Sequence, residues 1–236
     1  MPRGKLYLIP TPIGEGLIEE VIPQATLSVV QQLHVFVVEE LRTARRFLSR
    51  AKITTPINAL TFFELNEHTA PEQIYPFLQP ALDGHSIGLL SEAGAPAVAD
   101  PGAALVQLAH GLRIDVVPMV GPSSILLALM ASGLNGQSFA FAGYLPIPSH
   151  ERRERLKQLE HTAITSRQTQ LFIETPYRNL ALFADILLTA APSTRLCVAA
   201  GLTRPEQFIR TATIAQWKAA PVPDIHKKPC LFLLGY

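Results

Sequence analysis

Three short segments rich in proline and glycine have the composition of ligand-binding loops, and each follows an apolar run of strand length. They occupy residues 10–16, 91–102 and 118–124. Proline stiffens a turn, and glycine lets the main chain approach a bound molecule closely. Such loops suit a ligand held by main-chain groups, for example a nucleoside. None spells G-x-G-x-x-G or carries the P-loop lysine, so dinucleotide and P-loop sites are disfavoured. Loops of this kind that only connect elements are the alternative.

Two clusters of basic residues fall at helical spacing. The first comprises Arg42, Arg45, Arg46 and Arg50, and the second comprises Arg152, Arg153, Arg155 and Lys157. The formal net charge of +1 gives no global basic field, so any RNA binding has to come from such local clusters. Contact with phosphates is one interpretation, and a solvated helix face is the other.

The elements that would position these residues alternate between strand and helix. Residues 87–90 are typical of a strand buried on both faces, and Asp100 followed by Pro101 is a typical helix start with the aspartate as cap. The same patterns predict strands at 5–10, 35–38, 59–63 and 114–117, and helices at 24–33, 40–49 and 71–82. This rhythm predicts an α/β fold with a largely parallel sheet.

The second half of the chain continues the alternation after a proline-rich connector near residue 120. Strands are expected at 138–143, 170–174 and 195–199, and helices at 151–161 and 177–188, the latter capped by Thr175. Residues 208–213 and 230–236 predict antiparallel strands around a short helix near Trp217. We therefore expect two α/β domains, residues 1–118 and 122–236.

Composition excludes several classes of protein. Hydrophobic residues make up 48% of the chain and charged residues 17%, which describes a well-packed domain and not a disordered one. No apolar run approaches the roughly 18 residues of a membrane span, and the N-terminal apolar run is too short for a signal peptide. Cys197 and Cys230 lie in apolar runs and lack metal-site spacing, so we expect buried thiols, no metal and a cytoplasmic location.

Several motifs, in one order along the chain, resemble the tetrapyrrole-methylase superfamily, and within it the ribosomal RNA small subunit methyltransferase I branch, which methylates ribose 2′-hydroxyls. They occupy residues 6–14 (LYLIPTPIG), 91–96 (SEAGAP), 100–102 (DPG), 121–123 (GPS), 143–146 (GYLP), 152–156 (RRERL), 174–178 (ETPYR) and 202–203 (LT). The resemblance covers nearly the whole chain.

This resemblance implies a homodimer of two-domain α/β subunits with S-adenosylmethionine folded into a cleft between the domains. The cofactor residues that it implies are Pro12, Gly14, Ser91, Glu92, Ala93, Gly94, Pro96, Gly121, Pro122, Ser123, Leu202 and Pro229. Ribosomal RNA or the small ribosomal subunit would be the partner. The substrate residues expected for it are Arg42, Arg45, Arg46, Asn66, Arg152 and Arg153.

A ribose 2′-hydroxyl is a poor nucleophile near neutral pH and benefits from a general base. The candidate catalytic residues are Glu39, Glu67 and Glu92, with a structural ion pair between Glu39 and Arg42 as an alternative. Asp100 is most simply a helix cap, and a role for His68 as proton acceptor is a weaker candidate.

The chain departs from the pattern of the branch at several positions. Ala-Glu-Asp-Thr-Arg is replaced by residues 38–42 (VEELR), and Ser-Asp-Ala-Gly-Thr-Pro by residues 91–96 (SEAGAP). Residues 199–204 (AAGLTR) also differ, and the resemblance is to a short form without the C-terminal extension of many members. Two alternatives therefore stay open: methylation of a tetrapyrrole or other small molecule, or a non-catalytic homologue that binds S-adenosylmethionine or RNA.

Overall fold

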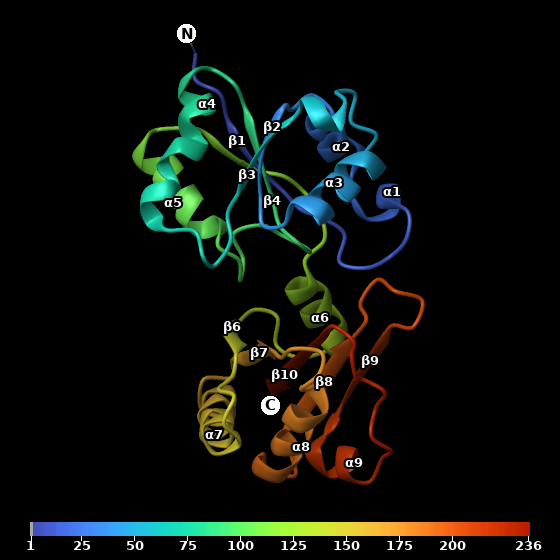
Figure 1. Cartoon of the computed structure of the whole chain (residues 1–236). Coiled ribbons are helices and arrows are strands. Elements are labelled where there is room, and N and C mark those ends of the chain that lie inside the picture. The colour runs from blue at the N-terminus through green and yellow to red at the C-terminus, as the bar shows by residue number, and fades with distance from the viewer. Residues whose placement is uncertain (1) are drawn as a thin grey trace. The chain divides into compact units, whose positions relative to one another are not determined.

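The chain folds into two compact units, unit 1 ending at Ser123 and unit 2 comprising Ser124–Tyr236 (Figure 1). The structure is a computed structural model and describes residues 2–236. Each unit contains a five-stranded sheet with helices on both faces. The predicted α/β fold class is therefore confirmed. The break between the units falls inside the segment 118–124 that the sequence marks as a connector.

The sheet of unit 1 is parallel throughout, with the strand order β3-β2-β4-β1-β5. Its strands are β1 (Leu6–Ile9), β2 (Val35–Val38), β3 (Thr61–Glu64), β4 (Ile87–Leu90) and β5 (Val116–Pro118). All residues of the inner strands β2 and β4 are buried. A strand covered by helices on both faces must be apolar throughout, which explains their unbroken apolar sequences.

Helices cover both faces of this sheet. α1 (Ile18–Val21), α2 (Gln24–Val30) and α3 (Leu41–Arg50) pack on one face, and α4 (Gln79–Leu82) and α5 (Gly102–Gly111) pack on the other (Figure 1). Two separate apolar clusters result, one on each face of the sheet. The first includes Phe36 and Phe47, and the second includes Leu78 and Leu105.

The prediction of a single helix over residues 71–82 is wrong. The structure has two 3-10 helices, η2 (Pro71–Gln73) and η3 (Tyr75–Leu78), before the short α4, with a further 3-10 turn, η1 (Ile57–Ala59), ahead of β3. Pro76 and Pro80 are responsible, because each lacks the N–H group that a continuous helix requires and its ring clashes with the preceding turn. Each proline accordingly lies at the first or second position of a new segment.

Two carboxylates begin the helices that follow β2 and β4. The carboxylate of Glu40 accepts hydrogen bonds from the N–H groups of Arg42 (2.8 Å) and Thr43 (2.7 Å), which lower its pKa and cap α3. Asp100 Oδ1 accepts from the N–H groups of Ala97 and Gly102, both at 2.8 Å. α5 begins at Gly102 with Pro101 as its N-cap, one residue later than predicted, and Asp100 binds the N–H group of the first helical residue from the turn before it.

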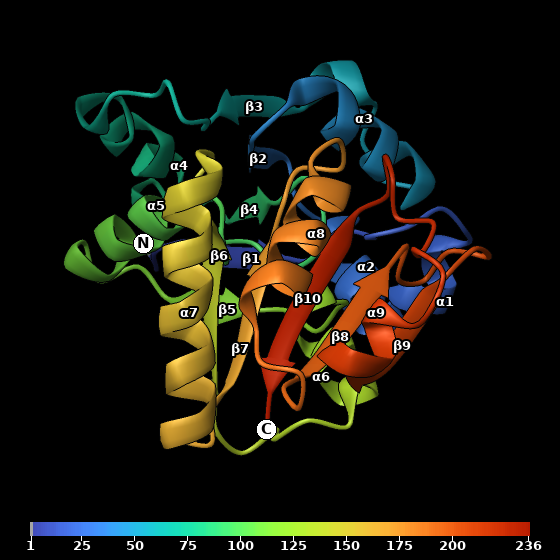
Figure 2. The same cartoon turned by 90° about the horizontal axis from the view of Figure 1, so that it is seen from below.

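The sheet of unit 2 is mixed, with the order β6-β7-β10-β8-β9 (Figure 2). Its strands are β6 (Phe139–Tyr144), β7 (Thr169–Ile173), β8 (Arg195–Ala200), β9 (Phe208–Thr213) and β10 (Cys230–Gly235). Only β6 and β7 pair in parallel, and the other pairs are antiparallel, as predicted for the last two strands.

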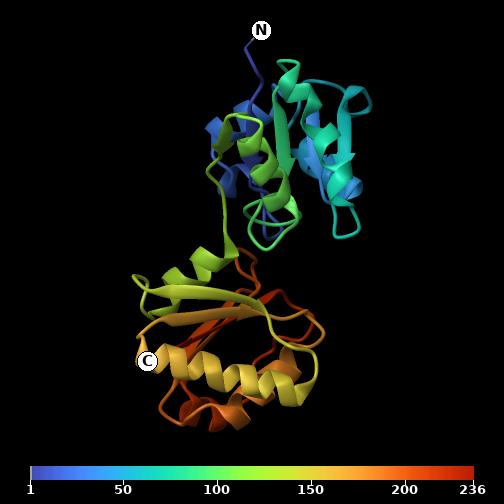
Figure 3. The same ribbon diagram turned by 90° about the vertical axis from the view of Figure 1, so that its left-hand side faces the viewer.

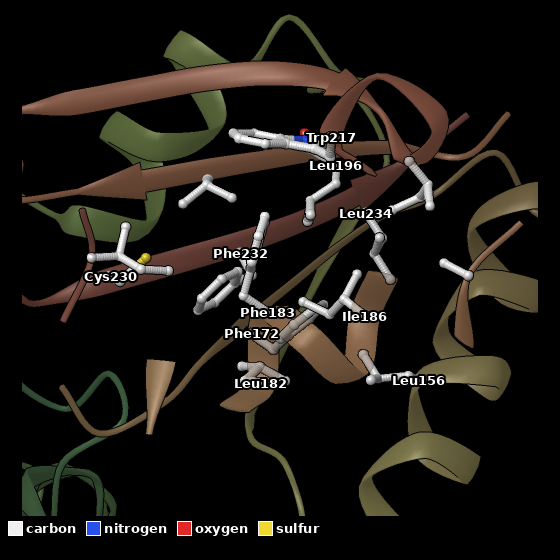
Figure 4. Packing of buried hydrophobic residues seen from close by; sticks show 14 of the residues in the cluster. Leu156, Phe172, Leu182, Phe183, Ile186, Leu196, Trp217, Cys230, Phe232 and Leu234 are labelled. Atoms are coloured by element: carbon white, nitrogen blue, oxygen red, sulfur yellow. Dashed lines mark hydrogen bonds between the residues drawn. The ribbon is translucent and has the colours of Figure 1, made fainter. Parts of the chain in front are cut away.

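Helices also cover both faces of this second sheet. α6 (Ser124–Ser132) lies on one face, and α7 (Ser149–Thr165), α8 (Asn179–Thr189) and α9 (Ile214–Lys218) lie on the other (Figure 3). Beneath the three helices, Phe172 of β7 stacks on Phe232 of β10 with ring centroids 6.0 Å apart (Figure 4). Trp217 packs edge-on against Phe183 and donates its indole N–H to the Leu196 carbonyl at 2.9 Å.

The start of α8 differs from the prediction. The helix begins at Asn179 and not at Tyr177, and Thr175 does not cap it. The buried carboxylate of Glu174 accepts hydrogen bonds from the Thr175 N–H and from the Arg178 guanidinium, so residues 174–178 form a separate turn. α9, by contrast, begins with a capping box between Thr213 and Gln216.

Two further features concern the cysteine side chains and the apolar character of the helices. Cys197 and Cys230 are buried free thiols, and burial raises the pKa of both. None of the helices within residues 2–236 has the length and apolar character that crossing a membrane requires.

Candidate functional site

The three loops singled out in the sequence meet at one edge of the unit 1 sheet. They follow β1, β4 and β5, and because these strands are parallel, their carboxyl ends lie at the same edge. The main chains of Thr11 and Gly94 exchange two hydrogen bonds, of 2.9 and 3.0 Å. A Cβ atom on Gly94 would lie 3.6 Å from the Pro122 carbonyl oxygen, so the third loop approaches the second closely. Ligands of open parallel sheets bind at this edge.

Buried hydroxyl groups fix the geometry of these loops. Thr11 Oγ1 donates to the Ser91 carbonyl (3.1 Å), and Ser91 Oγ donates to the Gly94 carbonyl (2.6 Å). Both side chains are buried. Ten of the twelve predicted cofactor residues lie on the three loops: Pro12, Gly14, Ser91, Glu92, Ala93, Gly94, Pro96, Gly121, Pro122 and Ser123. Their placement is what a ligand held by main-chain groups requires, and their role in binding stays a prediction.

Gly94 provides a first test of this loop geometry. Its φ of 83° lies in the left-handed region, and a Cβ atom there would also lie 3.3 Å from Ile13 Cγ2. We expect Gly94→Ala to lower the free energy of unfolding by about 1–2 kcal/mol and to weaken the Thr11–Gly94 link. Urea denaturation and calorimetric titration with S-adenosylhomocysteine measure the two effects. Gly133→Ala, also at a left-handed φ but with open space around it, is the control expected to leave ligand affinity unchanged.

Carboxylates gather at the same edge of the sheet. Glu39 follows β2, Glu67 lies three residues after β3 and Glu92 lies two residues after β4, and these strands are neighbours in the order β3-β2-β4. Burial, together with the charges of Glu92, Asp100 and Glu67, raises the pKa of Glu39 above its usual range. The structure thus brings the three predicted catalytic residues to one edge of the sheet, and Glu39 is the one of the three whose pKa is raised.

The carboxyl groups of Asp100, Glu67 and Glu92 at this edge each contact a different partner. Asp100 accepts the Gly102 N–H at the start of α5, while Glu67 lies in the exposed turn after β3, with its Oε1 3.6 Å from His68 Nε2. Glu92 Oε1 accepts a hydrogen bond of 2.6 Å from Thr43 Oγ1 of α3. Within residues 2–236, no three His, Cys, Asp or Glu side chains are grouped as a bound metal ion requires.

A cavity of about 190 Å³ opens beside this edge, between the loops and α3. It is lined by Thr11, Pro12, Gly14, Thr43, Ala44, Arg46, Phe47, Arg50, Ser91 and Glu92. Ligand sites for drug-sized molecules typically measure about 300–1,000 Å³, so this cavity fits a part of a larger ligand. The guanidinium groups of Arg46 and Arg50 favour an anionic group such as a phosphate on their side of the cavity, while the Glu92 carboxylate lines the other part.

The arginines of α3 share the exposed face that their spacing predicts. Arg46 and Arg50 line the cavity, and the Arg50 guanidinium donates to the Gly16 carbonyl. The Arg45 guanidinium lies 5.6 Å from the centre of the Phe62 ring, and Arg42 is exposed in the first turn of the helix. Among the described residues, none of these four guanidinium groups lies within 4 Å of a carboxylate oxygen. The ion pair between Glu39 and Arg42, the alternative to a catalytic role for Glu39, is therefore not formed.

The structure contradicts the expectation that Arg152 contacts phosphate. Only 5% of the residue is exposed, and its Nε and Nη2 atoms donate to Asp185 Oδ2 at 2.8 and 2.5 Å. A third hydrogen bond runs from Nη1 to the Ile147 carbonyl at 2.7 Å. Arg152 therefore ties α7 to α8 in the interior of unit 2, where a phosphate has no access.

Breaking this pair should cost stability. We expect Arg152→Ala to lower the free energy of unfolding by about 3–5 kcal/mol, because Asp185 would remain buried without its charged partner. Arg155→Ala, on the exposed face of the same helix, is the control expected to change it by less than about 0.5 kcal/mol. Equal effects of the two substitutions in urea denaturation would show that Asp185 is not held by Arg152.

Other predicted substrate residues occupy separate places. Arg153 is exposed on α7, 3.9 Å from Asp185, and lines a groove of about 510 Å³ with Lys157 and Leu188. Asn66 Oδ1 accepts the His68 N–H at 3.0 Å, which makes it a turn residue after β3. Its position beside the carboxylates is compatible with the predicted role, which stays a prediction.

Known proteins resemble this chain in both sequence and fold. The profile of the family described as Tetrapyrrole (Corrin/Porphyrin) Methylases matches residues 5–218. The chain belongs to this family. Among curated relatives, ribosomal RNA small subunit methyltransferase I of Vibrio cholerae is 32% identical over 243 residues, which cover 100% of this chain and 80% of the relative. The predicted class, a methyltransferase dependent on S-adenosylmethionine, is confirmed.

Solved structures share the fold. The methyltransferase CobJ has a TM-score of 0.64 and 17% identity, with 98% of this chain and 94% of CobJ covered. Uroporphyrin-III C-methyl transferase from Thermus thermophilus, complexed with S-adenyl homocysteine, has a TM-score of 0.58 and 18% identity, with 98% and 97% covered. At these identities the likeness concerns the fold of the tetrapyrrole methylase family.

In unit 2, the last two predicted cofactor residues of this methylase lie at one edge of the sheet. Leu202 follows β8 and Pro229 precedes β10, and these strands pair so that Ala200 is opposite Cys230. The Gly201 N–H donates to the Pro229 carbonyl at 2.9 Å, which holds the two loops together. Leu202 is buried, and its role in cofactor binding stays a prediction.

Sequence reasoning named neither Thr43 nor Tyr177 as a site residue, and it placed Arg50 in the first basic cluster without naming it as a substrate residue. Thr43 holds Glu92, Arg50 lines the cavity, and Tyr177 projects from the turn before α8. Arg50 carried a signal, because it continues the helical spacing of the other arginines. Thr43 carried none, since its partner lies 49 residues away along the chain.

Proposed function

We propose that this tetrapyrrole methylase transfers the methyl group of S-adenosylmethionine to a ribose 2′-hydroxyl of small-subunit ribosomal RNA. The observation that carries the proposal is the placement of Glu39, a carboxylate with a raised pKa, at the same sheet edge as an arginine-lined cavity. To methylate a ribose hydroxyl next to a phosphate, an enzyme needs a carboxylate that accepts the hydroxyl proton and a cation that binds the phosphate. The name of the Vibrio cholerae relative supports the choice of RNA.

The loops of unit 1 fit the cofactor. Gly94 presents a left-handed main chain, and a Cβ atom on Gly121 would lie 2.5 Å from Pro10 Cβ, so only glycine keeps these two loops at their present distance. When bound, S-adenosylmethionine supplies a reactive sulfonium methyl group. Pro12, Gly14 and residues 91–94 would hold it through main-chain groups and exclude water around it.

Glu39 is the proposed general base. Its raised pKa brings proton affinity closer to neutral pH than an ordinary glutamate offers, and it is half-buried at the end of β2. Glu92, held by Thr43, and Glu67 are proposed to orient the ribose through hydrogen bonds to its hydroxyl groups. The Thr43–Glu92 hydrogen bond limits the freedom of Glu92, which is what an orienting group requires.

Arginines are proposed to position the RNA. Arg46 and Arg50 bring positive charge to the cavity beside the loops, and Arg42 and Arg45 extend the basic face along α3. Arg153 is proposed to contact another phosphate of the RNA from the groove on α7. We also propose a homodimer in the cytoplasm, with light scattering coupled to size exclusion as the test of the oligomeric state.

Labelled methyl transfer tests the proposed function. Small ribosomal subunits from cells that lack the modification are incubated with the protein and S-adenosyl[methyl-³H]methionine. We expect label in the RNA of these subunits and none in RNA from mature subunits. Label in an added tetrapyrrole, with none in RNA, would support the alternative substrate, and binding of S-adenosylhomocysteine without any transfer would support a non-catalytic protein.

A further inference from the structure

Tyr177 is an exposed aromatic residue flanked by two basic side chains. It belongs to the turn between β7 and α8 in unit 2, and 72% of the residue is exposed. Lys227 Nζ lies 5.8 Å from the centre of its ring, and the His226 ring lies edge-on with its centroid 6.4 Å away. A ring with one cation beside it and its remaining surface in water is suited to stacking against another flat ring.

The turn that carries Tyr177 is rigid. The side chain of Glu174 is fully buried, and its Oε1 accepts hydrogen bonds from the Thr175 N–H (2.7 Å) and from Arg178 Nε (2.9 Å) and Nη2 (2.6 Å). This arrangement fixes the main chain on both sides of Tyr177. An exposed side chain on a fixed turn loses little main-chain freedom when it binds a ligand.

The basic residues are held against the same turn. The Lys227 N–H donates to the Pro176 carbonyl at 3.0 Å. Asn179 Nδ2 donates to the carbonyls of Ile225 (3.0 Å) and Lys228 (2.7 Å), so the first residue of α8 anchors the loop that carries His226 and Lys227. The aromatic ring and its two basic neighbours therefore form one preformed surface, here called the Tyr177 platform.

A second exposed tyrosine lies at the same edge of the sheet. Tyr144 ends β6, is 61% exposed and pairs with Ile173 of β7, directly before the turn of Tyr177. β6 and β7 run parallel, so both tyrosines follow carboxyl ends of adjacent strands. Successive aromatic side chains beside cations are how proteins bind unpaired nucleotides.

We propose that the Tyr177 platform, with Lys227 and His226, stacks on an unpaired base of the RNA substrate. This inference rests on the proposed function, since it concerns the same substrate. The tyrosine ring stacks on the face of one base, and the Lys227 ammonium contacts the adjoining phosphate. Stacking is tolerant of base identity, so the platform contributes affinity for single-stranded RNA more than sequence choice.

Fluorescence anisotropy with a labelled single-stranded RNA of about twelve nucleotides tests the platform. We expect Tyr177→Ala and Tyr177→Leu to weaken RNA binding about 5- to 100-fold, and Tyr177→Phe to bind within about twofold of the wild type. Lys227→Gln should lower the slope of log affinity against log salt by about 1. Tyr75→Ala, at an exposed tyrosine of unit 1, is the matched control expected to bind as the wild type does.

Affinity for S-adenosylhomocysteine, measured by calorimetry on the same proteins, separates RNA from the adenine of the cofactor. We expect it to be unchanged in every variant. Wild-type RNA affinity in Tyr177→Ala, or a loss of S-adenosylhomocysteine affinity in place of RNA affinity, would overturn the inference. Either result leaves the proposed function standing if the wild type still methylates small subunits. Thermal unfolding of Tyr177→Ala should match the wild type, because the side chain is exposed.

Discussion

Glu39→Gln is expected to lower the rate of methyl transfer about 10²- to 10⁴-fold and to raise the free energy of unfolding at pH 7. The first effect follows from loss of the general base. The second follows from the raised pKa of Glu39, which burial and the neighbouring Glu92, Asp100 and Glu67 cause. The folded protein binds the proton more tightly than the unfolded chain, so the stability contributed by this group is full at low pH.

That contribution is lost as the pH rises through the folded-state pKa of Glu39. At pH 7 the ionised carboxylate therefore destabilises the folded protein, whereas an uncharged glutamine at the same position does not. Single-turnover transfer and urea denaturation at pH 7 measure the two effects. The acid limb of the wild-type rate profile should lie above the usual range of glutamate and disappear in Glu39→Gln. Glu20→Gln, at an exposed glutamate of α1, is the control expected to change neither property. Full turnover in Glu39→Gln would remove Glu39 as the base.

Reversing two charges on α3 is expected to have the second large effect. The double variant Arg42→Glu/Arg46→Glu should lower affinity for small-subunit RNA more than tenfold at low salt, since each arginine is proposed to contact a phosphate. The slope of log affinity against log salt should fall by about 2, one for each contact. Filter binding over a series of salt concentrations gives both quantities.

Arg113→Glu is the matched control for this experiment. Arg113 is an exposed arginine of unit 1 that precedes β5, at the edge of the sheet opposite the carboxyl ends. It should lower the salt slope by much less than the double variant. If both proteins bind RNA with the same affinity and slope, the basic face of α3 is not the phosphate-contacting surface.

The predictable parts of the fold are those set by local pattern. The apolar runs predict the position of every strand to within a few residues. They do so because a strand covered by helices on both faces must consist almost entirely of apolar residues. The segment 71–82 has the apolar spacing of one helix but does not form one, because Pro76 and Pro80 interrupt it. α8 starts later than its pattern predicts because the buried carboxylate of Glu174 binds the Thr175 N–H and the Arg178 guanidinium, which holds residues 174–178 in a separate turn.

The sequence pattern indicates which residues are candidates for the site. It does not reveal which of them lie next to one another. Glu39, Glu67 and Glu92 are neighbours only because the strand order is β3-β2-β4, which no local pattern reveals. Arg152 was misassigned although a signal existed. Its spacing to Leu156, Leu159 and Ala163 places it on the buried stripe of α7, and its partner Asp185 lies 33 residues further along the chain.

The chemical identity of the methylated product tests the proposed function most directly. Ribosomal RNA labelled by the protein with S-adenosyl[methyl-³H]methionine is digested to nucleosides and separated by chromatography. We predict label in a single 2′-O-methylnucleoside, recovered after alkaline hydrolysis as a dinucleotide whose linkage resists cleavage because the 2′-oxygen is blocked. Label on a nucleobase, or RNA that carries no label while a tetrapyrrole does, would contradict transfer to a ribose hydroxyl.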